Sequence, residues 1–338
     1  MIDLLPSDEQ QQIIDSVANF FGRTESASVP SVQDGHGAAV RMRREMSALG
    51  WFGLGLAEAD GGVGYSLIEE MLLAREYGRA LAPPGLCAMT VAAHVAAQAG
   101  RRDMLRDILT GNPGVGMIVP TPPTAGGSGE VTLIAAEGAQ LLLFWNASGA
   151  GLYERAAFAP AAIGASLDET VSLERVAPTK ATPVAWVSSA SSPLPYRAGL
   201  LICAQLVGIA EAAKDLAVAY AKVREQFGQP IGAFQAIKHA CAEMAVQCEA
   251  AYAQTFFAGL SIGGGLPDAE FQYAAAGLLA PQAALRNARM GIQIHGGLGF
   301  TADCRAHRYL KRAHLLKWLT LPAHVFRGMC MAAGPMYG

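Results

Sequence analysis

The sequence predicts a mainly α-helical protein with a small β domain at its centre. Apolar residues recur at helical spacing in the first and last thirds, and short apolar runs alternate with turn residues between them. We expect three domains: a helical domain over 1–113, a shortened β domain over 114–190 and a helical bundle over 191–338.

The first third begins two of its helices with capping boxes, at Ser7–Gln10 and Ser66–Glu69. In this pattern a serine and a Glu or Gln three residues later satisfy each other's backbone amides. Further helices are expected over 40–49, 86–98 and 103–109. Gly111-Asn112-Pro113 is a strong stop signal that ends this helical domain.

The middle third predicts the strands of a small sheet. The apolar runs that carry this prediction are 116–119, 131–134, 141–145 and 184–187. Two Gly-rich stretches, Gly126–Gly129 and Gly149–Gly151, are followed by no Lys-Ser/Thr of a phosphate loop, so we interpret both as flexible turns. After the sheet, helices are expected over 197–226, 234–260, 267–294 and 304–318.

Composition excludes several classes of protein. Hydrophobic residues make up 52% and charged residues 16%, so the chain can bury a large core and is not disordered. A net charge of −3 gives no case for binding nucleic acid or an anionic membrane. No apolar run reaches the roughly 18 residues of a membrane span, and the acidic N-terminus shows no targeting signal. With six scattered cysteines and no metal-binding pattern, we expect a cytoplasmic protein with reduced thiols and no metal.

Two strings in the last third are candidate ligand sites. Arg224-Glu225-Gln226-Phe227-Gly228 follows a long helix, and Phe234-Gln235 begins the next one. Gln293-Ile294-His295-Gly296-Gly297-Leu298-Gly299-Phe300 ends a helix with glycines that allow close approach of a ligand, and their amides can bind a pyrophosphate. The plain alternatives are an ordinary helix–helix turn for the first string and a Gly-rich helix cap for the second. Taken by itself, His295 is interpreted as a packed or flavin-adjacent residue rather than a base or a metal ligand.

A basic segment follows these strings. Between Arg305 and Arg327 the chain has six Lys or Arg residues and three His residues but no carboxylate. A patch for an anionic ligand is one interpretation. A solvated helix face is the favoured one.

The order and spacing of these strings resemble the acyl-CoA dehydrogenase family over nearly the whole chain. Leu49–Gly64 and Glu76–Pro83 resemble its segments LGLxGLxxPExxGGxG and ExGRALAP, and the two C-terminal strings resemble its best-known signatures. The resemblance implies an α-helical domain, a small β-barrel-like domain and a C-terminal four-helix bundle. It implies an FAD-dependent oxidoreductase acting on the Cα–Cβ bond of an acyl-CoA, with an electron-transfer flavoprotein or similar acceptor.

In this family the two C-terminal strings bind the adenine and pyrophosphate end of a neighbouring subunit's FAD. The resemblance assigns this cofactor-binding role to Arg224, Gln226, Phe227, Phe234, Gln235, Gln293, His295, Gly296 and Gly297. The family's catalytic glutamate occupies one of two positions, which hold Thr320 and Tyr196 here. Neither hydroxyl is a ready base at neutral pH, since even tyrosine ionises only near pH ~10. The resemblance therefore assigns no catalytic residue to this chain.

A flavin-covering loop of the family matches Val119–Ser128, which lacks the family's Glu and Asp. We therefore predict a subunit that has lost its own flavin site and completes the FAD site of a partner. The implied partner is a paralogous acyl-CoA dehydrogenase with the catalytic Glu, in an α2β2 assembly that resembles those of actinobacterial sterol side-chain degradation. A steroid side-chain CoA thioester is the suggested substrate.

Two alternatives remain open. One is a self-sufficient homotetrameric flavoenzyme with a relocated base, for which Glu243 and Glu249 are nominal candidates. The other is a scaffold protein that keeps the fold without binding flavin. We expect no nucleic-acid or membrane partner under any of these interpretations.

Overall fold

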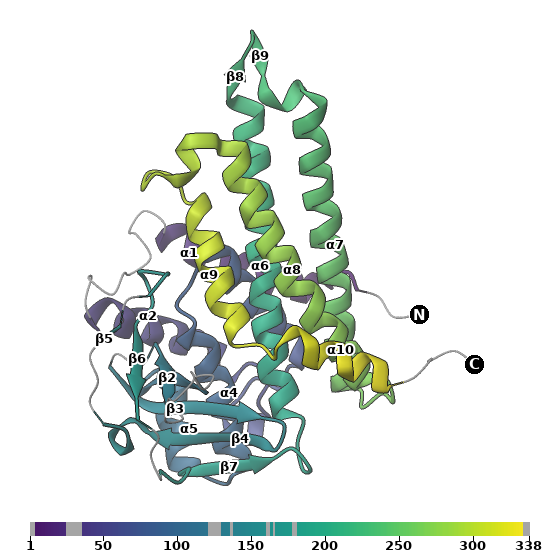
Figure 1. Ribbon diagram of the computed structural model, residues 1–338. Helices are drawn as coiled ribbons and strands as arrows, with labels where there is room; N and C mark the ends of the chain where they lie inside the picture. Colours follow the sequence, from purple (N-terminus) through teal and green to yellow (C-terminus); the bar gives the residue numbers. More distant parts are fainter. Residues whose placement is uncertain are drawn as a thin grey trace. The chain divides into compact units, whose positions relative to one another are not determined.

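The protein's computed structural model describes residues 4–24, 36–120, 130–135, 138–159, 163–164, 166–177 and 181–333. These residues divide into two compact units (Figure 1). The helical unit comprises Met1–Phe21, Met71–Ala82 and Gly199–Gly338, and the sheet unit comprises Gly22–Glu70 and Pro83–Ala198. Each is described by itself.

The helical unit contains all or most of seven helices within the described residues. They are α1 (Asp8–Thr24), α3 (Leu67–Ala80), α6 (Leu194–Val223), α7 (Gln235–Gly263), α8 (Ala269–His295), α9 (Ala306–Trp318) and α10 (Ala323–Ala332). The long helices α7 and α8 pack along each other (Figure 1). Glycines set the closest packing: a Cβ atom at Gly78 of α3 would lie 1.9 Å from the carbonyl oxygen of Gln205 in α6.

Both predicted capping boxes are present, in two variants. At the start of α1 the amide of Gln10 donates to Oγ of Ser7 at 3.2 Å, and the amide of Ser7 donates to Oε1 of Gln10 at 3.0 Å. Before α3 the hydroxyl and amide of Ser66 both donate to Oε2 of Glu69, at 2.6 and 2.8 Å. Each box therefore ties down the first turn of its helix.

The sheet unit is built on a mixed sheet with the order β5-β6-β2-β1-β3-β4-β7 in its described residues. The strands are β1 (Gly114–Pro120), β2 (Val131–Ile134), β3 (Ala139–Asn146), β4 (Gly149–Glu154), β5 (Ile163–Gly164), β6 (Leu173–Val176) and β7 (Ala185–Ser188). Only the described pair β1–β3 is parallel. The unit also contains the helices α2 (His36–Ala48), α4 (Gly85–Gln98) and α5 (Arg102–Leu109).

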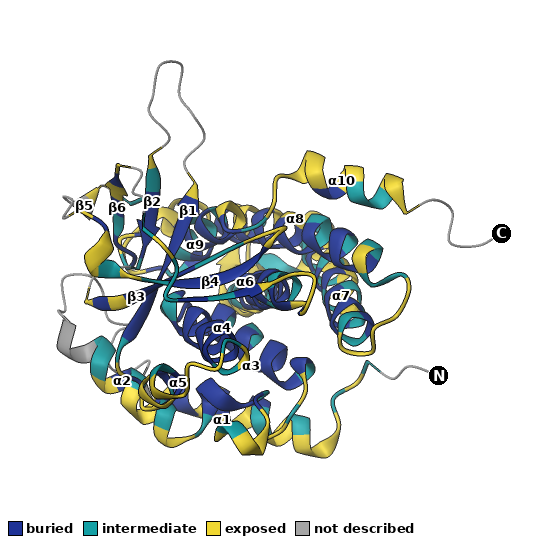
Figure 2. Ribbon diagram, turned by 90° about the horizontal axis from the view of Figure 1, so that it is seen from below, coloured by how far each residue is buried: buried dark blue, intermediate teal, exposed yellow. Residues whose placement is uncertain are grey.

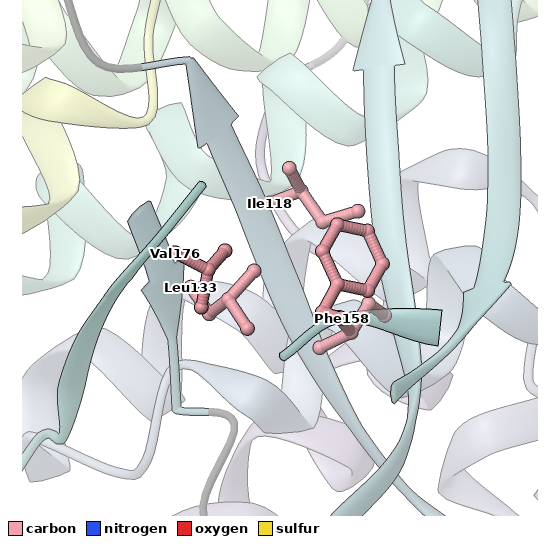
Figure 3. Packing of buried hydrophobic residues seen from close by; sticks show 5 residues of the cluster. Ile118, Leu133, Phe158 and Val176 are labelled. Atoms are coloured by element: carbon pink, nitrogen blue, oxygen red, sulfur yellow. The ribbon is translucent and has the colours of Figure 1, made fainter. Parts of the chain in front are cut away.

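Strand β1 lies in the core of the sheet unit, since its residues are buried from Gly114 to Val119. The side chains of Ile118, Leu133, Phe158 and Val176 pack together from four segments of the chain (Figure 3). Helix α4 packs against β1, β4 and β7, and it is buried along most of its length (Figure 2). This sheet and its covering helix confirm the predicted β region between helical segments.

One turn prediction is wrong. Gly149–Gly151, predicted to be a flexible turn, belongs to β4, which pairs with both β3 and β7. The glycines are needed because the ring of Trp186 lies over them: a Cβ atom at Gly151 would be 2.5 Å from Cε3 of that ring. The other stretch predicted as a turn, Gly126–Gly129, lies outside the described residues.

The C-terminal helices bring two further findings. Helix α10 has no counterpart in the sequence prediction, and it is held by buried Phe326, whose ring fills the space beside Gly277 of α8. In the basic segment, the prediction of a solvated face is wrong for Arg312, which is buried and donates to the carbonyl of Ala82. Among the residues that the structure describes, no helix has the length and apolar character needed to cross a membrane.

Candidate functional site

The first candidate string forms a hairpin at one end of the α6–α7 pair (Figure 1). Helix α6 ends at Val223, three residues before the predicted end, and β8 (Glu225–Gln226) pairs with β9 (Gln229–Pro230). The reversal requires left-handed backbone at two successive residues, Phe227 with φ of 53° and Gly228 with φ of 78°. This is the pattern of a tight two-residue hairpin, and it explains why the helix stops early.

The hairpin presents its side chains to solvent. Arg224 and Gln226 are exposed, and Phe227 is 93% exposed. The ring of Phe227 meets the ring of Phe234 edge-on, with centroids 6.2 Å apart. Gln235 is the first residue of α7 and is also exposed. The structure thus brings the five predicted residues of the first string to one end of the α6–α7 pair.

The second string supplies an open glycine turn after α8. Gly296 and Gly297 begin a 3-10 turn, η6 (Gly296–Phe300), and Gly296 has φ of 61°. Apart from the adjoining residues of the turn and helix, no atom of the described chain lies within 4 Å of the position that a Cβ atom would take on either glycine. A ligand can therefore approach the backbone closely at these two glycines. The amide of Gly296 itself donates to the carbonyl of Gln293. Gln293, one turn earlier, is exposed.

His295 differs from its neighbours in the string. Its ring is buried, stacks on Tyr220 with centroids 4.3 Å apart, and has Nδ1 2.7 Å from the carbonyl oxygen of Gly291. The imidazole therefore packs at the C-terminal end of α8, directly before the glycine turn. Its placement matches the packed interpretation of this residue.

The two positions that hold the glutamate in the resembling family show no base. Thr320 follows α9, and its hydroxyl donates to the carbonyl of Lys317 at 2.7 Å. Tyr196 lies in the first turn of α6 and is half-buried. The nominal replacements Glu243 and Glu249 lie on α7 and are exposed, whereas a base for an α-proton needs a site from which water is excluded.

A buried charged cluster in the sheet unit has no counterpart among the sequence predictions. Oε1 of Glu70 lies 2.7 Å from Nε2 of His94 and accepts from the amide of Gly55 at 3.1 Å, while Arg197 donates to Oε2. These groups come from four segments of the chain, and Arg197 lies 127 residues beyond Glu70 in the sequence, so no local motif reveals them. A side chain at position 55 would collide with Glu70, since a Cβ atom there would be 2.5 Å from Oε1.

Electrostatics fixes the protonation of this cluster. Burial alone would raise the pKa of Glu70, but the charges and hydrogen bonds of His94 and Arg197 outweigh burial and hold the pKa below its ordinary value. Glu70 is thus an ionised carboxylate whose oxygens are already engaged. Burial, reinforced by Glu70, also raises the pKa of the Cys87 thiol. We interpret the cluster as a structural ion pair rather than as a relocated base.

Within the described ranges no three His, Cys, Asp or Glu side chains come together as a metal would require. The six cysteines are free thiols.

Comparison with protein families covers both ends of the chain. Residues 7–111 match the family model described as acyl-CoA dehydrogenase, N-terminal domain, and residues 197–320 match acyl-CoA dehydrogenase, C-terminal domain. The acyl-CoA dehydrogenase FadE34 of Mycobacterium tuberculosis is 34% identical over 278 residues, which are 80% of this chain and 38% of FadE34. The acyl-CoA dehydrogenase IpdE2 of the same organism is 31% identical over 261 residues, 77% of this chain and 75% of IpdE2.

Solved structures share the fold. Butyryl-CoA dehydrogenase from Megasphaera elsdenii superposes with a TM-score of 0.79 at 20% identity, covering 98% of this chain and 99% of that one. The steroid ACAD variant Tcur3481-Tcur3483 gives a TM-score of 0.81 at 22% identity, covering 96% and 97%. The two family models and the relationship to IpdE2 show that the chain belongs to the acyl-CoA dehydrogenase family.

Proposed function

We propose that this chain is a subunit of a heteromeric, FAD-dependent acyl-CoA dehydrogenase and that it completes the FAD site of an unlike partner. The observation that carries the proposal is the exposed hairpin. Phe227 at its tip is 93% exposed, its ring meets the ring of Phe234 edge-on, and Arg224 on the same hairpin is also exposed. Burying such a ring against a ligand or partner is favourable, so an isolated chain leaves this surface unsatisfied.

The residues present fit the adenine and pyrophosphate end of FAD. Arg224 can make charge-assisted hydrogen bonds to a phosphate group, and the amide of Gly297, beside open space, can add a neutral one. Gln226, Gln235 and Gln293 are exposed amides that can bind ribose or adenine edges. When bound, FAD supplies the acceptor for the substrate's β-hydride. The chain's own contribution in this proposal is to bind and orient the nucleotide end of that cofactor.

The catalytic glutamate belongs to the partner in this proposal. Thr320 directs its hydroxyl into the end of α9, and Tyr196 offers only a phenol. The partner is accordingly a paralogous acyl-CoA dehydrogenase with its glutamate in place, in an α2β2 assembly. Electrons would leave through an electron-transfer flavoprotein or a similar acceptor.

The substrate class rests on similarity. One of the solved structures that share the fold is a steroid ACAD. We propose an acyl-CoA with a bulky group, such as a steroid side-chain thioester. Substrate trials with the assembled enzyme, comparing short-chain acyl-CoA with steroid-derived acyl-CoA, test this part separately from the FAD site.

The test of the FAD site is the flavin content per chain. The chain is purified alone and after co-expression with an acyl-CoA dehydrogenase paralogue encoded beside it. We expect almost no flavin alone and about one FAD per pair of unlike chains, and Arg224→Ala should remove most of it. Lys222→Ala is the matched control, because Lys222 is an exposed cation at the end of α6.

Other results would favour the alternatives. One FAD per chain in the isolated protein, with turnover, would indicate a self-sufficient flavoenzyme with a relocated base. Absence of flavin from every assembly would indicate a scaffold. An unchanged FAD content in the Arg224→Ala complex would overturn the role given to the hairpin.

A further inference from the structure

Tyr220 joins the two candidate strings at one end of the helical unit. It lies in the last turn of α6, one turn before Arg224. Its ring stacks on the ring of His295 in the second string, with centroids 4.3 Å apart and 21° between the ring planes. Its carbonyl accepts from the amide of Arg224 in the first string at 2.9 Å. A single residue therefore contacts both strings, one through its ring and the other through its backbone.

The backbone of Arg224 is held on both sides. Its amide donates to Tyr220, and its carbonyl accepts from the amide of Ile231 at 2.7 Å, where the chain returns from the hairpin. Gly232, the next residue, lies close against α6, since a Cβ atom there would be 2.9 Å from the carbonyl oxygen of Ala221. The last turn of α6 thus fixes the path of the first string.

The second string is held by the same part of α6. Ile294 packs in a buried cluster with Ala217 and Ala221 of α6. The half-buried side chain of Tyr220 packs against this cluster as well as on His295. A shift of the last turn of α8 relative to the first string would therefore disturb both the ring stack and the cluster.

We infer that Tyr220 is a positioning residue of the nucleotide site, which holds Arg224 and the glycine turn where one pyrophosphate can meet both. His295 is its stacking partner and not a contact of the cofactor. Groups that bind one ligand from two segments must be held within about 0.5 Å of the binding geometry by the residues behind them. The inference rests on the proposed function and adds the residue pair that makes one site of two separate strings.

The test removes one ring of the stack in the co-expressed complex. Tyr220→Leu keeps an apolar side chain at the end of α6 but has no ring. We expect it to raise the dissociation constant of FAD roughly tenfold, near the upper range for a stacked aromatic pair, without loss of the heteromer. Tyr220→Phe, the conservative variant, should restore the affinity. The readout is the flavin bound to the complex at equilibrium over a series of free FAD concentrations.

Tyr252→Leu is the matched control. Tyr252 stacks on Phe256 with ring centroids 4.4 Å apart and 26° between the planes, which is nearly the same geometry. It lies about 25 Å along α7 from Gln235 at the hairpin end. Both Tyr→Leu variants should lower the melting temperature, but only the one at position 220 should weaken FAD binding. Equal losses of FAD affinity would trace the effect to stability alone and would overturn the inference.

Variants of His295 separate positioning from direct contact. His295→Phe keeps a ring against Tyr220 and should keep most of the FAD affinity, whereas His295→Leu should lose as much as Tyr220→Leu does. Equal losses in both His295 variants would assign the imidazole to the cofactor itself and contradict its role as a stacking partner. His295→Leu also takes the place of Tyr220→Leu if that protein fails to fold.

A double-mutant cycle decides whether Tyr220 acts through Arg224. In the Arg224→Ala background, Tyr220→Leu should change the dissociation constant of FAD by much less than its factor in the wild-type background. The same factor in both backgrounds would overturn the inference. If Arg224→Ala weakens FAD binding and Tyr220→Leu does not, the inference falls and the proposed function stands. A wild-type complex without FAD would overturn both.

Discussion

Nε2 of His94 lies 2.7 Å from Oε1 of Glu70, and both side chains are buried in the sheet unit. Arg197 occupies the other carboxylate oxygen. The carboxylate of Glu70 is therefore the common anchor of α3, α4 and the first turn of α6. Its removal would leave the guanidinium of Arg197 without its buried counter-charge.

Glu70→Gln should destabilise the protein by about 3–5 kcal/mol at pH 7, the usual cost of removing one partner of a buried ion pair.

The lowered pKa of Glu70 also sets the direction of a pH effect. Its stabilising contribution is complete above the ordinary value of 4.5 and is lost as the pH falls through the lowered value. Urea unfolding of wild type and variant at pH 7 and below pH 4.5 measures the loss of stability and its dependence on pH. The difference between wild type and variant should shrink in acid, and an equal difference at every pH would contradict this account. Glu45→Gln, at an exposed site of the same unit, is the control.

Gly78→Ala should destabilise the helical unit by at least ~3 kcal/mol, at the upper end of overpacking effects. A Cβ atom there would lie 1.9 Å from a backbone oxygen of Gln205, and backbone cannot rotate aside as a side chain does. Gly22→Ala is the matched control, because no atom lies within 4 Å of its Cβ position and helix propensity favours alanine by about 1 kcal/mol. Thermal unfolding of both variants checks the pair. Equal effects at the two sites would contradict the packing.

Gly151→Ala should destabilise the sheet unit by roughly 1–3 kcal/mol, because its methyl group meets the Trp186 ring. Removing that ring in Trp186→Ala costs stability of its own but opens the space above β4. In the double variant the alanine at position 151 should then cost much less than it does alone. A double-mutant cycle measured by urea unfolding gives the coupling. If the effects of the two substitutions on stability simply add, the contact between position 151 and the Trp186 ring is contradicted.

Thiol labelling should divide the cysteines into two groups. Cys87, Cys203, Cys248 and Cys304 are buried, and burial raises the pKa of Cys203 and of Cys248 to about 12. Cys241 and Cys330 are partly exposed. The thiolate is the reacting species, so iodoacetamide should modify the latter two first in native protein. Peptide mass spectrometry reports the order, with guanidinium-unfolded protein as the reference. Fast reaction at Cys203 would contradict the burial of α6.

Local patterns predicted most elements but not the way they meet. The capping boxes at Ser7 and Ser66, and the stop at Gly111, place helix ends because the relevant hydrogen bonds span only a few residues. The role of Gly151 depends on Trp186, which lies 35 positions away, so the sequence suggested a turn where β4 runs. Tertiary contacts of this kind leave no trace in a sequence window.

The same distinction between local patterns and tertiary contacts applies to the candidate site. The exposed residues of the hairpin and the glycine turn belong to contiguous strings, which resemblance to a family can identify. The Glu70–His94–Arg197 cluster is assembled from distant segments and becomes visible only in three dimensions. His295 combines the two cases. The sequence shows its position in the second string, but its stacking on Tyr220 is visible only in the structure.

The hairpin at Phe227 keeps its shape through its own backbone. Gln226 pairs with Gln229, and the amide of Ile231 donates to the carbonyl of Arg224 at 2.7 Å. Ordering a flexible loop on contact would cost about 1–2 kcal/mol for each residue fixed. A molecule that binds here meets a rigid projection whose entropy was lost when the chain folded. The energy released on burying the Phe227 ring is then not reduced by the cost of ordering this backbone.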